Sequence, residues 1–247
     1  MRAGSTGPSF RRSIPPAPFD EDLVGSHHPA ADATGAAPLT LRDTLFGDLA
    51  LPHWPPAGAP VGDAPWSSFA AARHHLEAGD PGAARARWRE VLALPGLDTR
   101  HYLQAWSFLR AQGDRPPEAQ AKQVHGVVLE VALAEGLDLL AAYDDHSARY
   151  YNYSGAGVVW ERPDASLDGC IDRLLTHSVA VVQRIGPWLE PRRPAPPAGQ
   201  VRINFLTPSG LYFGEGTMEA LMGYPVAVPV LNGAIELMQQ LVDRQAA

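Results

Sequence analysis

Residues 66–114 show the helical pattern of apolar positions. Large apolar residues recur every three or four positions, between glycines and prolines that interrupt the pattern. This predicts three helices, bounded by Trp66 and Gly79, by Pro81 and Pro95, and by Thr99 and Gly113. Gly79 is expected to end the first helix, because glycine adopts the positive φ that commonly follows a helix without strain.

From about Val124 the apolar positions form short, β-branched runs that are typical of strands. Four strands are predicted, at 127–133, 139–143, 149–154 and 158–161, each followed by turn residues. Links this short join only antiparallel neighbours, since parallel strands need a crossover of about a dozen residues or more. The sequence therefore predicts an antiparallel β-meander.

The remaining chain predicts a helix, a hairpin and a closing helix. Helical spacing runs from Leu167 to Ile185, with Asp164 or Ser166 as candidate N-cap. A proline-rich link over 190–199 leads to a strand at 201–206, which turns into 211–213, and 231–242 again shows helical spacing. The predicted fold class is α+β, with an N-terminal helical hairpin region packed on an antiparallel β-meander with two C-terminal helices.

Three regions are expected along the chain. Residues 1–65 hold 11 of the 24 prolines and are predicted to be a mostly disordered arm, because they offer little apolar surface to offset the entropy of ordering. A helical region over 66–123 and an α+β domain over 124–247 follow. We expect these two regions to bury each other's apolar faces.

One segment of the arm, near 40–49, has the spacing of a short amphipathic helix. Its apolar positions are Leu41, Leu45, Phe46 and Leu49. Two interpretations remain open. The helix packs back onto the chain's own domain, or it is a linear motif that docks into the groove of a protein partner.

The helical region resembles a tetratricopeptide repeat. Gly79-Asp80 and Gly113-Asp114 lie 34 residues apart, which is the period of that family. Small Ala72 and Ala84 and large Trp88 stand where a repeat places its packing residues. The likeness covers about one and a half repeats and ends at Lys122, where a second large residue would stand. It implies that a peptide or protein binds in a helical groove.

Composition and charge narrow the classes of partner. The net charge of −7 disfavours nucleic-acid binding, which needs clustered positive charge. The sequence contains no run of 18 apolar residues, so no membrane span is predicted. No apolar stretch of a signal peptide follows Met1, and a cytoplasmic location is therefore expected. The single cysteine, Cys170, excludes an internal disulfide or a multi-cysteine metal site. Only Lys122 among the 20 basic residues is lysine, a bias typical of GC-rich, bacterial coding.

The search for chemistry yields one candidate surface and no catalytic motif. Asp144, Asp145 and His146 form a polar group that is best explained as a hairpin turn. The alternation of the third strand places Tyr150, Asn152 and Ser154 on one face. We expect these three to join Arg202 and Asn204 in an aromatic and polar surface for a ligand or partner.

The function expected from the sequence is a soluble, non-enzymatic interaction or adaptor protein that binds a peptide or protein. The alternative is an enzyme or small-molecule sensor with a polar and aromatic pocket on the sheet. No cofactor, metal site, catalytic residue, nucleic acid or membrane is expected. An enclosed cleft of about 300–1,000 Å³ with convergent polar groups would favour the alternative.

Overall fold

We analysed a computed structural model, which describes residues 40–245. The part of the predicted arm before residue 40 lies outside the described residues. The helices are α1 (Trp66–Glu77), α2 (Pro81–Leu92), α3 (Thr99–Ala111), α4 (Glu118–Ala121), α5 (Asp168–Val182), α6 (Met218–Met222) and α7 (Val228–Gln245). The strands are β1 (Gly126–Ala132), β2 (Leu137–Tyr143), β3 (Ala148–Tyr151), β4 (Gly157–Trp160), β5 (Val201–Thr207) and β6 (Gly210–Gly216). The α+β class is confirmed.

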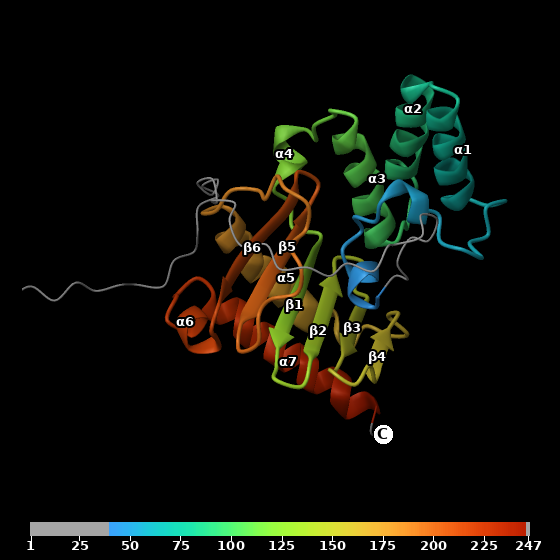
Figure 1. Cartoon of the computed structure of the whole chain (residues 1–247). Helices are drawn as coiled ribbons and strands as arrows, with labels where there is room; N and C mark the ends of the chain where they lie inside the picture. Colours follow the sequence, from blue (N-terminus) through green and yellow to red (C-terminus); the bar gives the residue numbers. More distant parts are fainter. Residues whose placement is uncertain (1–39, 246–247) are drawn as a thin grey trace, which may run out of the picture.

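The strands form one six-stranded antiparallel sheet in the order β4-β3-β2-β1-β5-β6 (Figure 1). The predicted meander supplies β1 to β4, and the β5–β6 hairpin pairs with the free side of β1. Val128 lies opposite Ala141 on β2 and Asn204 on β5, so β1 is the centre of the sheet. Successive residues of β1 point to opposite faces, which we call the front and the back.

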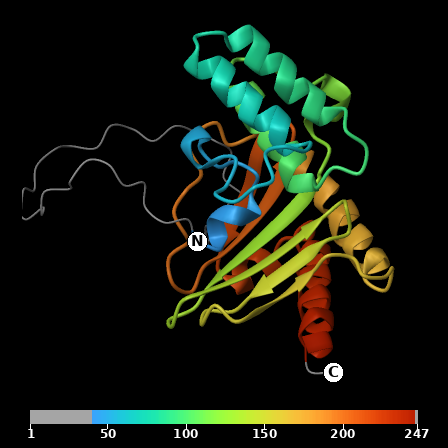
Figure 2. The ribbon, with the colours of Figure 1, turned by 90° about the vertical axis from the view of Figure 1, so that its right-hand side faces the viewer.

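The back face is covered by α5 and α7 (Figures 1 and 2). Leu129, Ile203 and Phe205 on the strands pack into one apolar cluster with Leu174 of α5 and Leu231 of α7. All five are buried. The helical periods of α5 and α7 place their apolar stripes toward the sheet, as the sequence predicted.

The front face is covered by irregular chain and by one helix. Leu45 and Phe46, from the segment over residues 40–54, pack with Leu103 of α3 against Val128 and Tyr143 of the sheet. Residues 187–194, which we call the strap, cross the same face farther toward β6 and pair with it where Trp188 meets Leu211. Figure 2 shows these segments on the opposite side of the sheet from α5 and α7.

Helices α1 and α2 pack on α3 at one end of the sheet (Figure 1). Gly79 has a φ of +78°, as the turn sequence predicted, and Asp80 caps α2 by accepting a hydrogen bond from the amide of Ala83. The buried core of this layer includes Ala72, Ala84 and Trp88. These are the residues that carry the tetratricopeptide resemblance, which itself stays a prediction.

Two local predictions differ from the structure. The helix expected near 40–49 is only a 3₁₀ turn, η1 (Arg42–Leu45), followed by a second, η2 (Leu51–His53). Gly47 ends the first turn with a φ of +60° and lies so close to α3 that a Cβ there would stand 2.7 Å from the carbonyl oxygen of Arg100. Helix α5 begins at Asp168 rather than near Asp164, because the side chain of Asp164 accepts from the amide of Ser166 and holds a turn.

Within residues 40–245, no helix combines the length and the apolar character that crossing a bilayer requires.

Candidate ligand-binding site

A cavity of about 840 Å³ lies on the front face of the sheet. Four stretches distant in sequence form its walls: residues 42–48, the second half of α3, the strap and the turn between β5 and β6. Leu103 and Leu211 contribute apolar surface, and Ser107 and Thr207 contribute hydroxyls. Seven of the 21 lining residues are charged, so the walls combine apolar area with many polar groups.

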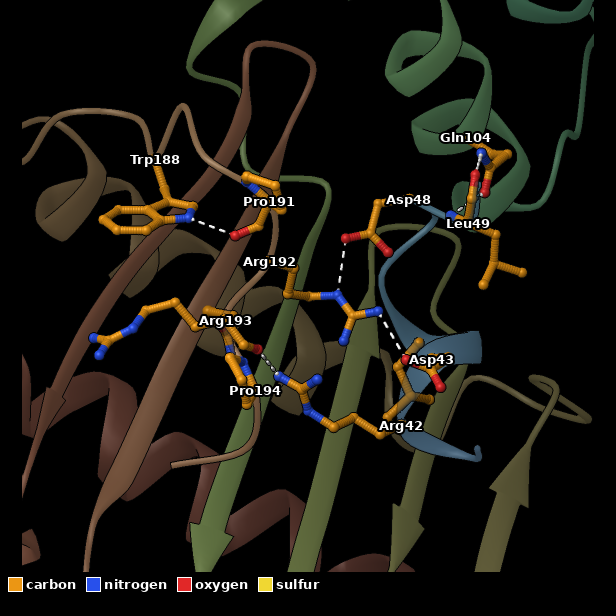
Figure 3. A network of polar contacts seen from close by, with 12 residues as sticks. Arg42, Asp43, Asp48, Leu49, Gln104, Trp188, Pro191, Arg192, Arg193 and Pro194 are labelled. Atoms are coloured by element: carbon orange, nitrogen blue, oxygen red, sulfur yellow. Dashed lines mark hydrogen bonds and ion pairs between the residues drawn. The ribbon is translucent and has the colours of Figure 1, made fainter. Parts of the chain in front are cut away.

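Arg192 fastens the strap to the N-terminal wall of the cavity (Figure 3). Its Nε donates to Asp48 at 2.9 Å and its Nη2 donates to Asp43 at 3.0 Å. The guanidinium also lies 4.2 Å from the centroid of the Phe46 ring. One arginine therefore joins the strap to both ends of the 43–48 stretch.

These contacts change the pKa of the Asp43 carboxyl group. Partial burial would raise its pKa, but hydrogen bonds from Thr40 and Arg192 outweigh burial and lower the pKa to about 2. Asp43 is therefore ionised at neutral pH and is a poor proton acceptor.

The strap has a further attachment and a hydrogen bond within itself. Arg42 Nη2 donates to the carbonyl oxygen of Arg193 at 2.8 Å, and the indole of Trp188 donates to the carbonyl oxygen of Pro191 at 2.9 Å (Figure 3). On the opposite wall, Gln104 of α3 exchanges two hydrogen bonds with the backbone of Leu49, both 2.8 Å long. These contacts fix the positions of segments that have no regular secondary structure.

Beneath the strap, a buried ion network crosses the centre of the front face. Glu130 on β1 is fully buried and contacts Arg42 at 2.5 Å and Arg202 at 3.3 Å. Asn204 donates to the same carboxylate at 2.9 Å, and Arg202 also binds Glu215 at 2.6 Å. Each charge of this network has an opposite partner, which burial requires.

The predicted grouping of Tyr150, Asn152 and Ser154 with Arg202 and Asn204 is wrong. Strands β3 and β5 are separated by β2 and β1. Tyr150 pairs with Leu140 on the back face, whereas Arg202 and Asn204 point to the front and are buried. Asn152 and Ser154 hydrogen-bond to each other in the β3–β4 turn.

The candidate docking residues lie on the chain's own domain. Leu45, Phe46 and Leu49 are buried against the sheet and α3, and only Leu41 is exposed, at 46%. This arrangement agrees with the first of the two interpretations, in which the segment packs back. It also means that the arm predicted over 1–65 packs on the domain between residues 40 and 54, while most of residues 56–64 are exposed.

Arg110, in the last turn of α3, lines the cavity and was not singled out by the sequence. Its Nη1 donates to the carbonyl oxygen of Pro208 at 2.7 Å. Burial lowers the pKa of its guanidinium to about 10, although the nearby charge of Asp48 acts in the opposite direction. No motif marks such a residue, because its place depends on how the β5–β6 turn meets α3.

The polar group at the β2–β3 turn holds α3 rather than forming a reactive site. Asp145 accepts from the amide of Thr99 at 2.8 Å, and Asp144 hydrogen-bonds to the Thr99 hydroxyl. His125 Nδ1 lies 2.6 Å from Asp144, but its Nε2 is buried and has no partner in the described chain. This nitrogen is therefore closed to a substrate, although part of the imidazole is exposed.

Residues 40–245 contain no cluster of three or more side chains suited to holding a metal ion. Cys170 is buried on α5, and burial raises the pKa of its thiol. Comparison of the chain with protein-family models, with curated proteins and with solved structures gave no match.

Proposed function

We propose that this chain is a non-catalytic binding protein whose ligand is a small molecule in the front-face cavity. The observation that carries the proposal is the cavity itself, about 840 Å³ in volume and walled by four segments that ion pairs and hydrogen bonds hold together. Its size lies within the range of known ligand sites. It is an open cleft whose volume matches the one that the alternative interpretation of the sequence requires, at a different place on the sheet.

The chemistry of the walls favours binding over catalysis. The described residues that line the cavity include no histidine, cysteine, lysine or tyrosine. Asp43 and Asp48 are both engaged by Arg192, and Ser209 Oγ donates to the carbonyl oxygen of Ala121 at 2.5 Å. Of the carboxylates that line the cavity, only the exposed Glu190 has no ion pair within residues 40–245, and no hydroxyl of the described wall residues hydrogen-bonds to it.

Binding of a peptide or protein by the α1–α2 pair stays a prediction from the resemblance. Among residues 66–111, no large hydrophobic side chain is exposed. A smaller cavity of about 460 Å³ lies beside α1, but its apolar walls come mainly from residues 55–61, and α1 contributes mostly polar side chains. The front-face cavity is thus the better supported site.

A matched pair of tryptophan substitutions tests the proposal. Ala111 is exposed at the rim of the cavity, so Ala111→Trp should obstruct it without disturbing the core, while Ala86→Trp places the same side chain on the exposed side of α2. A ligand at about 100 times its dissociation constant adds about 2.7 kcal/mol to stability. This corresponds to a rise in melting temperature of about 5–10 °C for a chain of this size.

Thermal melting in the presence of a broad library of small organic molecules provides the readout. The proposal expects compounds that stabilise the wild type and Ala86→Trp but not Ala111→Trp. Hits that shift all three proteins equally would place binding elsewhere. A library without hits on the wild type would also contradict the proposal.

A further inference from the structure

Arg110 differs from the other arginines around the cavity in having no carboxylate partner. Arg42 pairs with Glu130, Arg192 with Asp43 and Asp48, and Arg193 with Glu215 at 3.8 Å. Within residues 40–245, no carboxylate oxygen lies within 4.0 Å of the Arg110 guanidinium. Asp48, whose charge acts on Arg110, is itself bound to Arg192.

Arg110 is held in place but keeps most of its donors. Its one hydrogen bond within the described chain, from Nη1 to Pro208, leaves Nε and Nη2 without a partner there. The residue that faces this edge is Gly210, where a Cβ would stand 3.7 Å from Nε. Because Gly210 has no side chain, the Nε edge is uncovered from that direction. This edge carries two parallel N–H groups, the fork that matches the two oxygens of an oxyanion.

The electrostatic balance of the site also favours an anion. Burial removes hydration from this cation, and the charge of Asp48, which already binds Arg192, offsets only part of the loss, which agrees with the lowered pKa of Arg110. With a pKa of about 10 the guanidinium is still charged at neutral pH. An anion beside it would restore the balance that the other arginines already have.

The remaining walls describe the rest of the ligand. Leu103, Leu206 and Leu211 line the cavity near the sheet, and Trp188 and Leu189 line it from the strap. Leu189 is 84% exposed, so its side chain is available to cover a bound molecule. These side chains offer contact area to an apolar body, while the charged side chains of the strap line the rest of the cavity.

We propose that the ligand is a small organic oxyanion, with one carboxylate or phosphate group held by Arg110 and an apolar body against the leucines and the strap. This inference rests on the proposed function, because it assigns the ligand of the same cavity. A carboxylate and a phosphate both present two oxygens to the guanidinium, so the experiment tests each head group separately.

The test compares charged probes with a neutral analogue by isothermal titration calorimetry. The probes are 3-phenylpropionate, phenyl phosphate and the uncharged 3-phenylpropionamide. The full chain is used as wild type, Arg110→Gln and Arg115→Gln, where Arg115 is an exposed arginine one turn beyond α3. We expect at least one anion to bind the wild type about 10-fold or more tighter than the amide, since a hydrogen-bonded charge is worth about 1.5–3 kcal/mol.

The variants separate recognition of the anion from a structural role of Arg110. Arg110→Gln should lose about 10-fold or more of the affinity for the anion and keep its affinity for the amide, whereas Arg115→Gln should bind like the wild type. If Arg110→Gln melts far below the wild type, its affinities cannot be compared. The test is then the NMR signal of the Arg110 Nε–H group in the ¹⁵N-labelled wild type. That resonance should shift with the anion and not with the amide.

The two proposals fail in different ways. Equal binding of anion and amide, sensitive to Ala111→Trp, would overturn the oxyanion and leave the cavity as a binding site. An unshifted Arg110 resonance in the presence of a bound anion would have the same meaning. Binding of anions that Ala111→Trp leaves unchanged would overturn both proposals.

Discussion

The two faces of the sheet are covered in different ways, although they share the same six strands. The back is closed by two regular helices, and its strand residues, such as Ile203 and Phe205, are buried among apolar side chains. The front is closed by a 3₁₀ turn, a proline-rich strap and the side of α3, and it buries Glu130 and Arg202. Regular helices interdigitate with a sheet at close-packed density, whereas irregular segments rely on specific polar contacts and leave space between them. The front therefore contains the cavity.

The largest difference between the faces should appear when one phenylalanine is truncated on each. Phe205→Ala on the back should lower the free energy of unfolding by about 3–5 kcal/mol, because its side chain is fully buried. Phe213→Ala on the next strand is the matched control, since Phe213 points to the front and is half-buried. We expect a loss of about 1–2 kcal/mol there. Urea denaturation measures both, and equal losses would contradict the contrast.

The buried charges of the front face give the next largest effect. Glu130→Gln keeps the shape of the side chain but leaves Arg42 without a carboxylate, at a cost of about 3 kcal/mol in unfolding free energy. Glu215→Gln, at the more exposed end of the network, should cost about 1 kcal/mol or less. Chemical denaturation at neutral pH compares the two. A loss for Glu130→Gln no greater than that for Glu215→Gln would show that the network contributes little.

The fastening of the strap predicts a smaller and local effect. Arg192→Met removes both ion pairs to Asp43 and Asp48, and should weaken the strap by about 1–2 kcal/mol. The backbone amide of Trp188, which donates to the carbonyl oxygen of Leu211, should then exchange with solvent about 10-fold faster. Arg89→Met, which removes an ion pair to Asp114 in the helical layer, should leave this amide unchanged.

The smallest effect is the acid dependence of the same contact. The pKa of Asp43 is lowered from 3.8 to about 2 in the folded protein, so its contribution to stability is present above pH 4 and is lost as the pH falls toward 2. Because the Asp43 side chain is 29% exposed and solvent screens its ion pair, we expect less than about 1 kcal/mol. Melting curves between pH 4 and pH 2 should show a weaker dependence for Asp43→Asn than for the wild type. Parallel curves would show that Asp43 does not contribute.

The sequence predicted the elements of this fold better than the site. Periodicity places the helices and strands because each needs an apolar face, and turns such as Gly79-Asp80 have a local mechanism. The predicted grouping of Tyr150 with Arg202 failed because of topology. Alternation along a strand shows which residues share a face of that strand, but it does not show which strands are neighbours. The insertion of β5 beside β1 places Arg202 opposite Glu130, which lies 72 positions away.

The cavity was beyond sequence reasoning for a related reason. Its walls meet because Gly47 allows the N-terminal segment to lie close to α3. They also meet because Arg192 of the strap forms ion pairs with Asp43 and Asp48 of that segment. The pattern at Leu45 and Phe46 predicted that this segment buries an apolar face. It did not show whether that face packs on the chain's own domain or on a partner. The adjacent Arg192 and Arg193 of a proline-rich link were the available signal for the strap, and the two carboxylate partners of Arg192 lie more than 140 positions away.

The central claim is that the front face, and not the back, binds a small oxyanion. Two-dimensional NMR of the labelled chain, titrated with 3-phenylpropionate, tests this claim most directly. The account predicts shifts at the end of α3, in the strap and at the β5–β6 turn, with α5 and α7 unchanged. Shifts centred on α5 and α7, or no shifts with any of the anionic probes, would contradict it.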